Sequence, residues 1–185
     1  RMRLGTAKYK AVDDFVNANG LGQLLPTYTA RTITNTNNPG YEVASGLLGR
    51  YGFDAGSMVG MKASALGKIP LRFEDYHTMR VATNKALNTL ERGMATAEKM
   101  GSSIPAENKA AKAYLQDLKT ALDNDAERWA ARHASNEDAL NLYRDATQYY
   151  RDVVAPTVLD NPIARKAMSG SRGFKTGREG LAASQ

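Results

Sequence analysis

The feature that most constrains this chain is the helical spacing of apolar residues between residues 72 and 100. Its apolar side chains are Phe73, Tyr76, Met79, Leu87, Leu90, Met94 and Ala97, and with Thr83 in the gap they recur in steps of three and four. Such steps gather side chains on one face of an α-helix, and Gly101 ends the pattern. The sequence therefore predicts one long helix with a single buried stripe.

Two more helices follow after short links. A start in "SIPAE" (residues 103–107) combines a serine cap, a proline for the first turn and a glutamate that complements the helix dipole. A second start in "SNED" places Ser135 three residues before Asp138, an acidic variant of the capping box, and Pro156 closes this helix. Because the links are short, consecutive helices should lie antiparallel. We predict an all-α protein whose core is an antiparallel three-helix bundle over residues 71–156.

The first 70 residues differ from the bundle. We expect a helix over about residues 8–18, stopped by a glycine. Residues 21–41 contain Pro26 and the polar run "TNTNNPG", which favour irregular chain. The predicted organisation is an N-terminal helix, linker and glycine-rich segment over residues 1–70, the bundle over residues 71–156, and a short helix with a flexible basic tail over residues 157–185.

A glycine-rich run between residues 43 and 68 raises a question about packing. Gly52, Gly56, Gly60 and Ser64 recur every four residues, so on a helix they would form a smooth strip. In a free helix the six glycines of this run would be about 6 kcal/mol less favourable than alanines. We expect the strip to be ordered only against another backbone, in an oligomer or at a membrane. A connector packed on the bundle and a disordered run are the alternatives. Arg50, Asp54 and Lys62 interrupt the run and argue against a simple membrane span.

The positive charge lies towards the two ends of the chain. The net charge is +6, and residues 157–185 contain five basic and two acidic side chains. Basic residues of this kind suit the phosphates of nucleic acid, with low sequence specificity. We predict phosphate contact through Arg165, Lys166, Arg172, Lys175 and Arg178.

Residue types that support catalysis or metal binding are few. The chain has no cysteine, and its two histidines, His77 and His133, lack the paired spacing of a zinc helix. In "LYRDATQYYRDVV", tyrosines alternate with arginines as they do in nucleic-acid-binding segments. Each arginine there precedes an aspartate that cancels the local field, so we favour packing and ion pairing. We predict no enzyme activity, no metal and no cofactor.

The stretch "ALNLYRDATQYYRDVVAPTVLDNPIARKAMSG", residues 139–170, resembles the helical regions of internal virion proteins of tailed phages. These proteins are also called ejection or DNA transfer proteins. In that family a tyrosine-rich helix commonly runs into a "VVxP" exit, which a short basic segment follows. Here the exit is Val153 to Pro156, and the basic residues are Arg165 and Lys166.

The resemblance implies a non-enzymatic protein that is stored inside the virion, expelled ahead of the genome, and used to build a conduit across the host envelope. Its partners would be further copies of itself, other virion proteins, packaged DNA and the host membrane. One alternative is a structural or adaptor subunit of a virion or other large complex without membrane passage. The other is a cell-wall-degrading domain, in which Glu74 or Glu137 would supply the acid. Because the chain begins with Arg1, we also expect it to be a segment of a longer protein.

Overall fold

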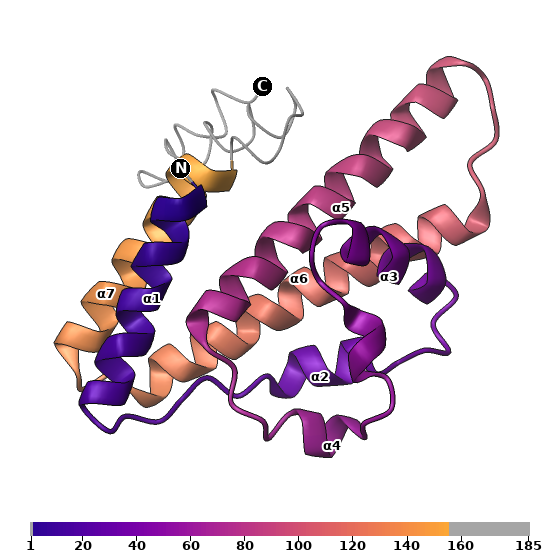
Figure 1. Ribbon diagram of the computed structural model, residues 1–185. Coiled ribbons are helices and arrows are strands. Elements are labelled where there is room, and N and C mark those ends of the chain that lie inside the picture. Colours follow the sequence, from indigo (N-terminus) through magenta and orange to yellow (C-terminus); the bar gives the residue numbers. More distant parts are fainter. Residues whose placement is uncertain (1, 156–185) are drawn as a thin grey trace.

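The computed structural model describes residues 2–155, which form α-helices joined by turns and loops (Figure 1). The helices are α1 (Met2–Ala18), α2 (Thr27–Ile33), α3 (Tyr41–Arg50), α4 (Ala63–Leu66), α5 (Phe73–Lys99), α6 (Ala106–Arg132) and α7 (Glu137–Tyr149), with a 3₁₀ turn, η1 (Ala55–Met58), after α3 and a π-helical turn, η2 (Tyr150–Val154), after α7. Extended chain pairs within these residues only at an isolated bridge between Leu24 and Leu71. The all-α prediction is confirmed.

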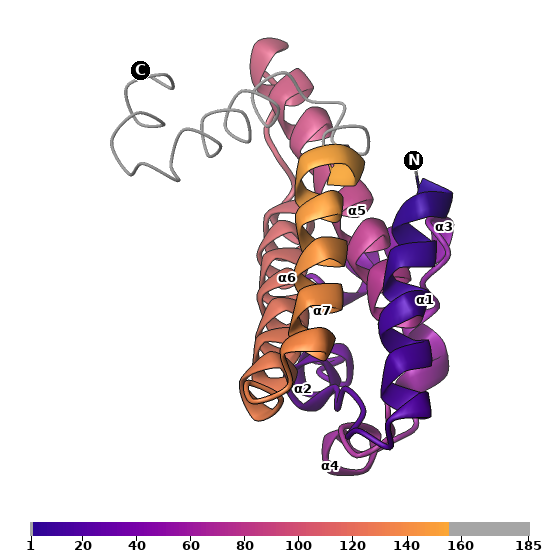
Figure 2. The same ribbon diagram turned by 90° about the vertical axis from the view of Figure 1, so that its left-hand side faces the viewer.

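The long helices form two antiparallel pairs. α5 and α6 make a long hairpin, and α1 and α7 lie side by side in two perpendicular views (Figures 1 and 2). α1 also packs on α5, so it joins the two pairs. The observed arrangement differs from the predicted three-helix bundle, because α7 packs mainly against a fourth helix, α1, rather than against α6.

α1 belongs to the same hydrophobic core as the helices that follow residue 70. Its residues Tyr9, Val12 and Val16 are at most 4% exposed, and their spacing places them on one helix face. The ring of Tyr9 stacks on Phe73 of α5 with ring centroids 6.3 Å apart, and Phe73 meets Trp129 of α6 edge to face at 4.7 Å. The core therefore crosses the boundary that we expected at residue 70, and residues 157–185 lie outside the described residues.

The N-terminus of α5 is capped by a residue of another helix. The carboxylate of Asp13 in α1 accepts hydrogen bonds from the backbone N–H groups of Phe73 at 2.7 Å and Glu74 at 3.0 Å. The N-cap residue of α5 itself, Arg72, makes no side-chain cap. Asp13 therefore satisfies two of the N–H donors that the first turn of a helix leaves unpaired, and it ties α1 to α5.

The prediction of irregular chain over residues 21–41 is wrong for Thr27–Ile33, which forms α2. This short helix also has no side-chain cap of its own. The buried carboxylate of Asp125 in α6 accepts hydrogen bonds from the N–H groups of Tyr28 and Thr29, both at 2.9 Å. Because the cap comes from a distant part of the chain, the local sequence does not reveal this helix.

α3 approaches α6 closely at Gly40. A Cβ atom built on Gly40 would lie 2.3 Å from the carbonyl carbon and oxygen of Ala110 and 2.4 Å from the nitrogen of Ala111. The side-chain oxygen of Asn38 accepts a hydrogen bond from the N–H of Gly40 at 2.8 Å, which shapes the turn into α3. Among the glycines in the first half of the chain, this one permits a tight contact between backbones.

α7 begins one residue later than the capping pattern suggested. Asn136 is its N-cap, and the side-chain oxygen of Asn136 accepts a hydrogen bond from the N–H of Ala139 at 3.0 Å. Ser135 therefore does not take the predicted role, because the asparagine next to it provides the acceptor.

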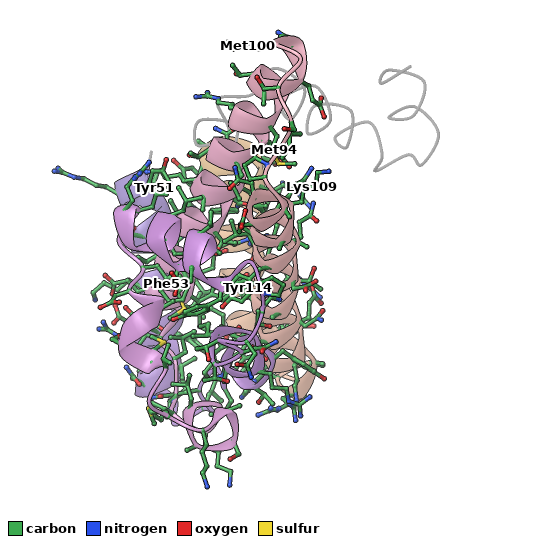
Figure 3. All side chains as sticks on the ribbon, turned by 90° about the vertical axis from the view of Figure 1, so that its right-hand side faces the viewer. Tyr51, Phe53, Met94, Met100, Lys109 and Tyr114 are labelled. Atoms are coloured by element: carbon green, nitrogen blue, oxygen red, sulfur yellow. The ribbon has the colours of Figure 1, made fainter. Side chains whose placement is uncertain are left out.

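The tip of the α5–α6 hairpin extends beyond the other helices (Figures 1 and 3). Met100 is 75% exposed, and Met94 and Ala97 are only partly buried. The stripe that we predicted for α5 is fully buried as far as Leu90, because the other helices pack along the lower part of the hairpin.

Candidate functional site

The glycine-rich run does not form one helix. α3 ends at Arg50, Gly52 has a φ of 90°, which favours glycine, and η1 and α4 follow as separate short elements. Gly52, Gly56, Gly60 and Ser64 therefore do not share a helix face. A Cβ atom on Gly52 or Gly60 would meet no atom within 4 Å. Because α3 ends at Arg50, before the first of these four residues, they do not form a helical strip. Contact of these residues with another subunit or a membrane stays a prediction.

A hollow of about 300 Å³ lies beside this run, and Gly52 is one of its lining residues. Its other residues come from the run, the chain before α5, and α5 itself: Phe53, Asp54, Ser57, Met58, Leu71, Asp75, Thr78 and Met79. Arg72 already pairs with Asp75, with Nε 3.2 Å from Oδ2. The hollow therefore carries one paired carboxylate, and the carboxylate of Asp54 accepts from the N–H of Ser57 at 3.3 Å.

The residues considered for catalysis or metal binding are distributed over three helices. His77 is buried in α5, and His133 follows α6 with its Nδ1 2.9 Å from the carbonyl oxygen of Trp129. Glu74 lies in the first turn of α5, and Glu137 is exposed at the start of α7. Within residues 2–155, no group of three or more histidine, aspartate or glutamate residues could hold a metal ion.

A buried polar cluster joins α5, α6 and the π turn. The guanidinium carbon of Arg80 lies 4.3 Å from the ring centre of Tyr150, and its Nη2 lies 3.3 Å from Oδ1 of Asp123. The side-chain amide of Asn84 donates a hydrogen bond to the hydroxyl of Tyr150. The Nε and Nη1 of Arg80 have no hydrogen-bond partner among the described residues. The carboxylate and the tyrosine face together stabilise this buried charge.

Burial shifts the proton equilibria of this cluster. It raises the pKa of Tyr150 to about 12, although Arg80 acts in the opposite direction. His77 stacks on Tyr9 at 5.0 Å and meets Tyr150 edge-on at 5.5 Å. Burial first, and Arg80 second, lower the pKa of His77 to about 4. At neutral pH His77 is therefore uncharged, and Tyr150 keeps its proton.

The π turn and α1 close this cluster against solvent. π turns often occur at functional sites, and η2 contributes Tyr150 to the cluster and Val154 to the contact with α1. A Cβ atom on Gly5 would lie 3.1 Å from Val154 Cγ2 and 3.2 Å from His77 Nε2. Because α1 passes so closely, we interpret the cluster as a rigid link between helices rather than as a binding site.

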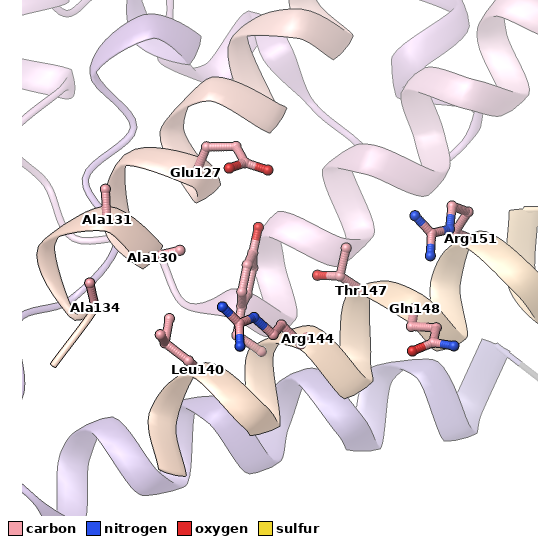
Figure 4. Close-up of a pocket in the computed structure, with 10 residues that line it drawn as sticks. Glu127, Ala130, Ala131, Ala134, Leu140, Arg144, Thr147, Gln148 and Arg151 are labelled. Atoms are coloured by element: carbon pink, nitrogen blue, oxygen red, sulfur yellow. The ribbon is translucent and has the colours of Figure 1, made fainter. Parts of the chain in front are cut away.

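A groove of about 610 Å³ opens between α6 and α7, where the two helices separate (Figure 4). Its lining residues come from these two helices and the first residues after each: Glu127, Ala130, Ala131, Ala134, Leu140, Tyr143, Arg144, Thr147, Gln148 and Arg151. The α6 side is formed by small alanine side chains and one glutamate. The α7 side combines a buried apolar floor with polar and basic side chains at the rim.

The two walls of the groove carry opposite charge. Glu127 on α6 and Arg144 on α7 are both exposed, and neither forms an ion pair in the part of the chain that the structure describes. Arg151, further along the α7 wall, is 51% exposed and lies 3.6 Å from Asp152. The α6 wall, with Glu127 beside the alanines, is therefore acidic, and the α7 wall, with Arg144 and Arg151, is basic.

Of the two arginine–aspartate pairs in this stretch, Arg151 and Asp152 form the predicted ion pair, with Nε 3.6 Å from Oδ1, whereas Asp145 pairs with a residue of another helix instead of with Arg144. Consecutive helical residues point in different directions, and the carboxylate of Asp145 lies 2.6 Å from Nζ of Lys8 in α1. Arg144 instead lines the groove. The predicted packing is confirmed for Tyr143 and Tyr150, which are buried, whereas the predicted cancellation is wrong for Arg144.

The sequence reasoning missed the groove, although its α6 wall has a readable signal. Glu127, Ala130, Ala131 and Ala134 stand in steps that place them near one face of a helix. Such a face on a helix predicted to lie in a bundle would be expected to be covered. The groove exists because α7 departs from α6 to pack along α1, which no local pattern encodes.

The basic residues that we predicted to contact phosphate lie outside the described residues: Arg165, Lys166, Arg172, Lys175 and Arg178. Their role stays a prediction. Among the described residues, none of the helices is long and apolar enough to cross a membrane. No protein family, curated protein or solved structure matches this chain.

Proposed function

We propose that this chain is a non-enzymatic segment of a phage internal virion protein, which oligomerises and helps to form a conduit for genome delivery across the host envelope. The observation that carries the proposal is the α6–α7 groove, because it has the features of a protein-binding surface. Alanines along α6 allow close approach of another helix, and arginines at the rim are typical of interfaces.

The composition of the groove favours binding over catalysis. Glycoside hydrolysis by the usual mechanisms requires a pair of carboxylic acids. Among the described residues that line the groove, Glu127 is the one carboxylic acid, so the groove does not supply the required pair. The candidates that the sequence suggested, Glu74 and Glu137, do not line it.

The virion context of the proposal rests on the resemblance of residues 139–170 to internal virion proteins. The described part of this stretch contains α7 from its third residue onward and the π turn, and it supplies one wall of the groove. In this proposal the basic residues of the tail contact packaged DNA, and the protein moves from the virion interior to the host envelope.

Assembly and membrane association are tested on the purified chain by analytical ultracentrifugation and liposome flotation. We expect oligomers that float with anionic liposomes, and weaker flotation for Gly56→Leu and Gly60→Leu. Gly93→Leu is the matched control for Gly60→Leu, because a Cβ at either position meets no atom within 4 Å and Gly93 lies outside the run. A chain that oligomerises without floating in any form would favour the structural or adaptor alternative. A chain that neither oligomerises nor floats would contradict the proposal.

DNA contact is tested by measuring affinity at several salt concentrations. We expect the affinity to fall steeply as salt rises, and removal of residues 169–185 to flatten this dependence, because fewer counterions are released. A salt dependence unchanged by the truncation would refute phosphate contact through that part of the tail.

The prediction of no enzyme activity is tested by zymography on cell-wall material. We expect no clearing by the wild-type chain. Clearing that is lost in Glu74→Gln, Glu137→Gln or Glu127→Gln would favour the cell-wall-degrading alternative and would identify its acid.

A further inference from the structure

We propose that the α6–α7 groove is the surface through which two copies of this chain associate, with the acidic wall of each copy against the basic wall of the other. This inference rests on the proposed function, and it names the partner that occupies the groove. A surface with one acidic and one basic wall is complementary to itself after a two-fold rotation, which is the symmetry of most homodimers.

Two charges of the groove have no ion-pair partner among the described residues of one copy. Glu127 and Arg144 are exposed on opposite walls, and the described residues offer neither of them an ion pair. In the close-up they project from different helices on the two sides of the hollow (Figure 4). A second copy related by a two-fold axis would bring its Arg144 to Glu127 and its Glu127 to Arg144, so the dimer would contain this ion pair twice.

The neighbouring aspartates do not interfere with this pairing. Asp145 is held by Lys8 on the α1 side of α7, at 2.6 Å. Arg151 retains more than half of its exposure despite its contact with Asp152. The basic wall therefore keeps its positive potential towards the groove, and an oppositely charged wall on the partner would both guide and align the association.

The alanines of α6 allow the two copies to approach. Ala131 and Ala134 are exposed, and Ala130 is partly buried. Small side chains let helix backbones come close together, so a helix of the second copy fits beside α6 without displacing larger groups. A purely acidic or purely basic partner would leave one wall facing like charge, and such a contact is unfavourable.

The test is a charge-reversal exchange, followed by sedimentation. Arg144→Glu and Glu127→Arg are each expected to raise the dissociation constant of self-association by at least about tenfold, because every contact occurs twice and each becomes like-charged. Equal amounts of the two variants are expected to associate again, since each substituted wall then meets an opposite charge on the other variant. Glu98→Arg and Lys99→Glu, exposed at the far tip of the hairpin, are the controls and should associate like the wild type.

Recovery in the mixture distinguishes contact between copies from a folding defect, and circular dichroism of each variant checks the fold separately. A wild-type chain that stays monomeric would overturn both this inference and the assembly function. Association that is equal in the wild type and both groove variants would overturn the inference while leaving the assembly function intact. Loss in the single variants without recovery in the mixture would also overturn it, because the predicted pairing requires that recovery.

Discussion

The carboxylate of Asp125 offers a direct test of how distant parts of the chain stabilise each other. It is 2% exposed and accepts hydrogen bonds from two N–H groups at the start of α2, those of Tyr28 and Thr29, both at 2.9 Å. Hydrogen bonds to a charged group contribute about 1.5–3 kcal/mol each. Asp125→Asn keeps one acceptor but places an amide donor against the other N–H. We therefore expect it to lower the free energy of unfolding by about 2–3 kcal/mol, and Asp125→Ala by about 3–5 kcal/mol.

Urea unfolding followed by circular dichroism measures this loss, and thermal unfolding should show a decrease in Tm of about 5–10 °C for the asparagine variant. Asp117→Asn is the matched control, because it makes the same chemical change at an exposed site of α6. Hydrogen exchange of the Tyr28 and Thr29 amides adds a local measurement, and both should exchange faster in Asp125→Asn. Equal stability of Asp125→Asn and Asp117→Asn would refute the reasoning that α6 caps α2.

Two further predictions concern a close backbone contact and a buried histidine. In urea unfolding, Gly40→Ala should lower the free energy of unfolding by about 1–3 kcal/mol, because its Cβ would overlap the backbone of Ala110. Gly46→Ala, inside α3, has open space around its Cβ and should raise the free energy of unfolding by up to about 1 kcal/mol. Equal changes in the free energy of unfolding for the two variants would contradict a close contact between Gly40 and Ala110. The pKa of His77, about 4 in the fold, is below the unfolded value near 6.5, so protonation favours unfolding. The unfolding free energy should fall by up to about 3 kcal/mol as pH decreases from 6.5 to 4, and His77→Phe, which keeps a ring beside Tyr9, should remove this part of the pH dependence. If the free energy of unfolding of His77→Phe depends on pH as in the wild type, this part of the pH dependence does not come from His77.

Several elements could be predicted because their signals are local. The periodic apolar residues of α5 and α6 placed both helices within a residue or two of their observed bounds. The burial of Tyr143 in α7 and Tyr150 in the π turn was also expected, since packing was the favoured interpretation of the tyrosines in this stretch. These features depend on side chains a few residues apart, and so the sequence contains the information directly.

Other elements could not be predicted because they depend on distant partners. α2 is a short helix whose cap, Asp125, lies 97 residues further along the chain than Tyr28. The tightest backbone approach in this region is at Gly40, where a Cβ would lie 2.3 Å from Ala110, whereas a Cβ on Gly52 or Gly60 would meet no atom within 4 Å. A regular spacing of glycines suggests a smooth surface, but whether anything approaches that surface is a property of the packed structure.

The sequence by itself determined that the chain is helical, where its longest helices lie, and which of their faces are apolar, because the period of 3.6 residues converts local spacing into a buried stripe. Only the tertiary structure decided which helices become neighbours. The choice of α1 as the partner of α7 opened the groove beside α6, turned Asp145 towards Lys8, and left Arg144 and Glu127 facing each other across the hollow. Such choices depend on how several apolar faces fit together at once, and no segment carries that information alone.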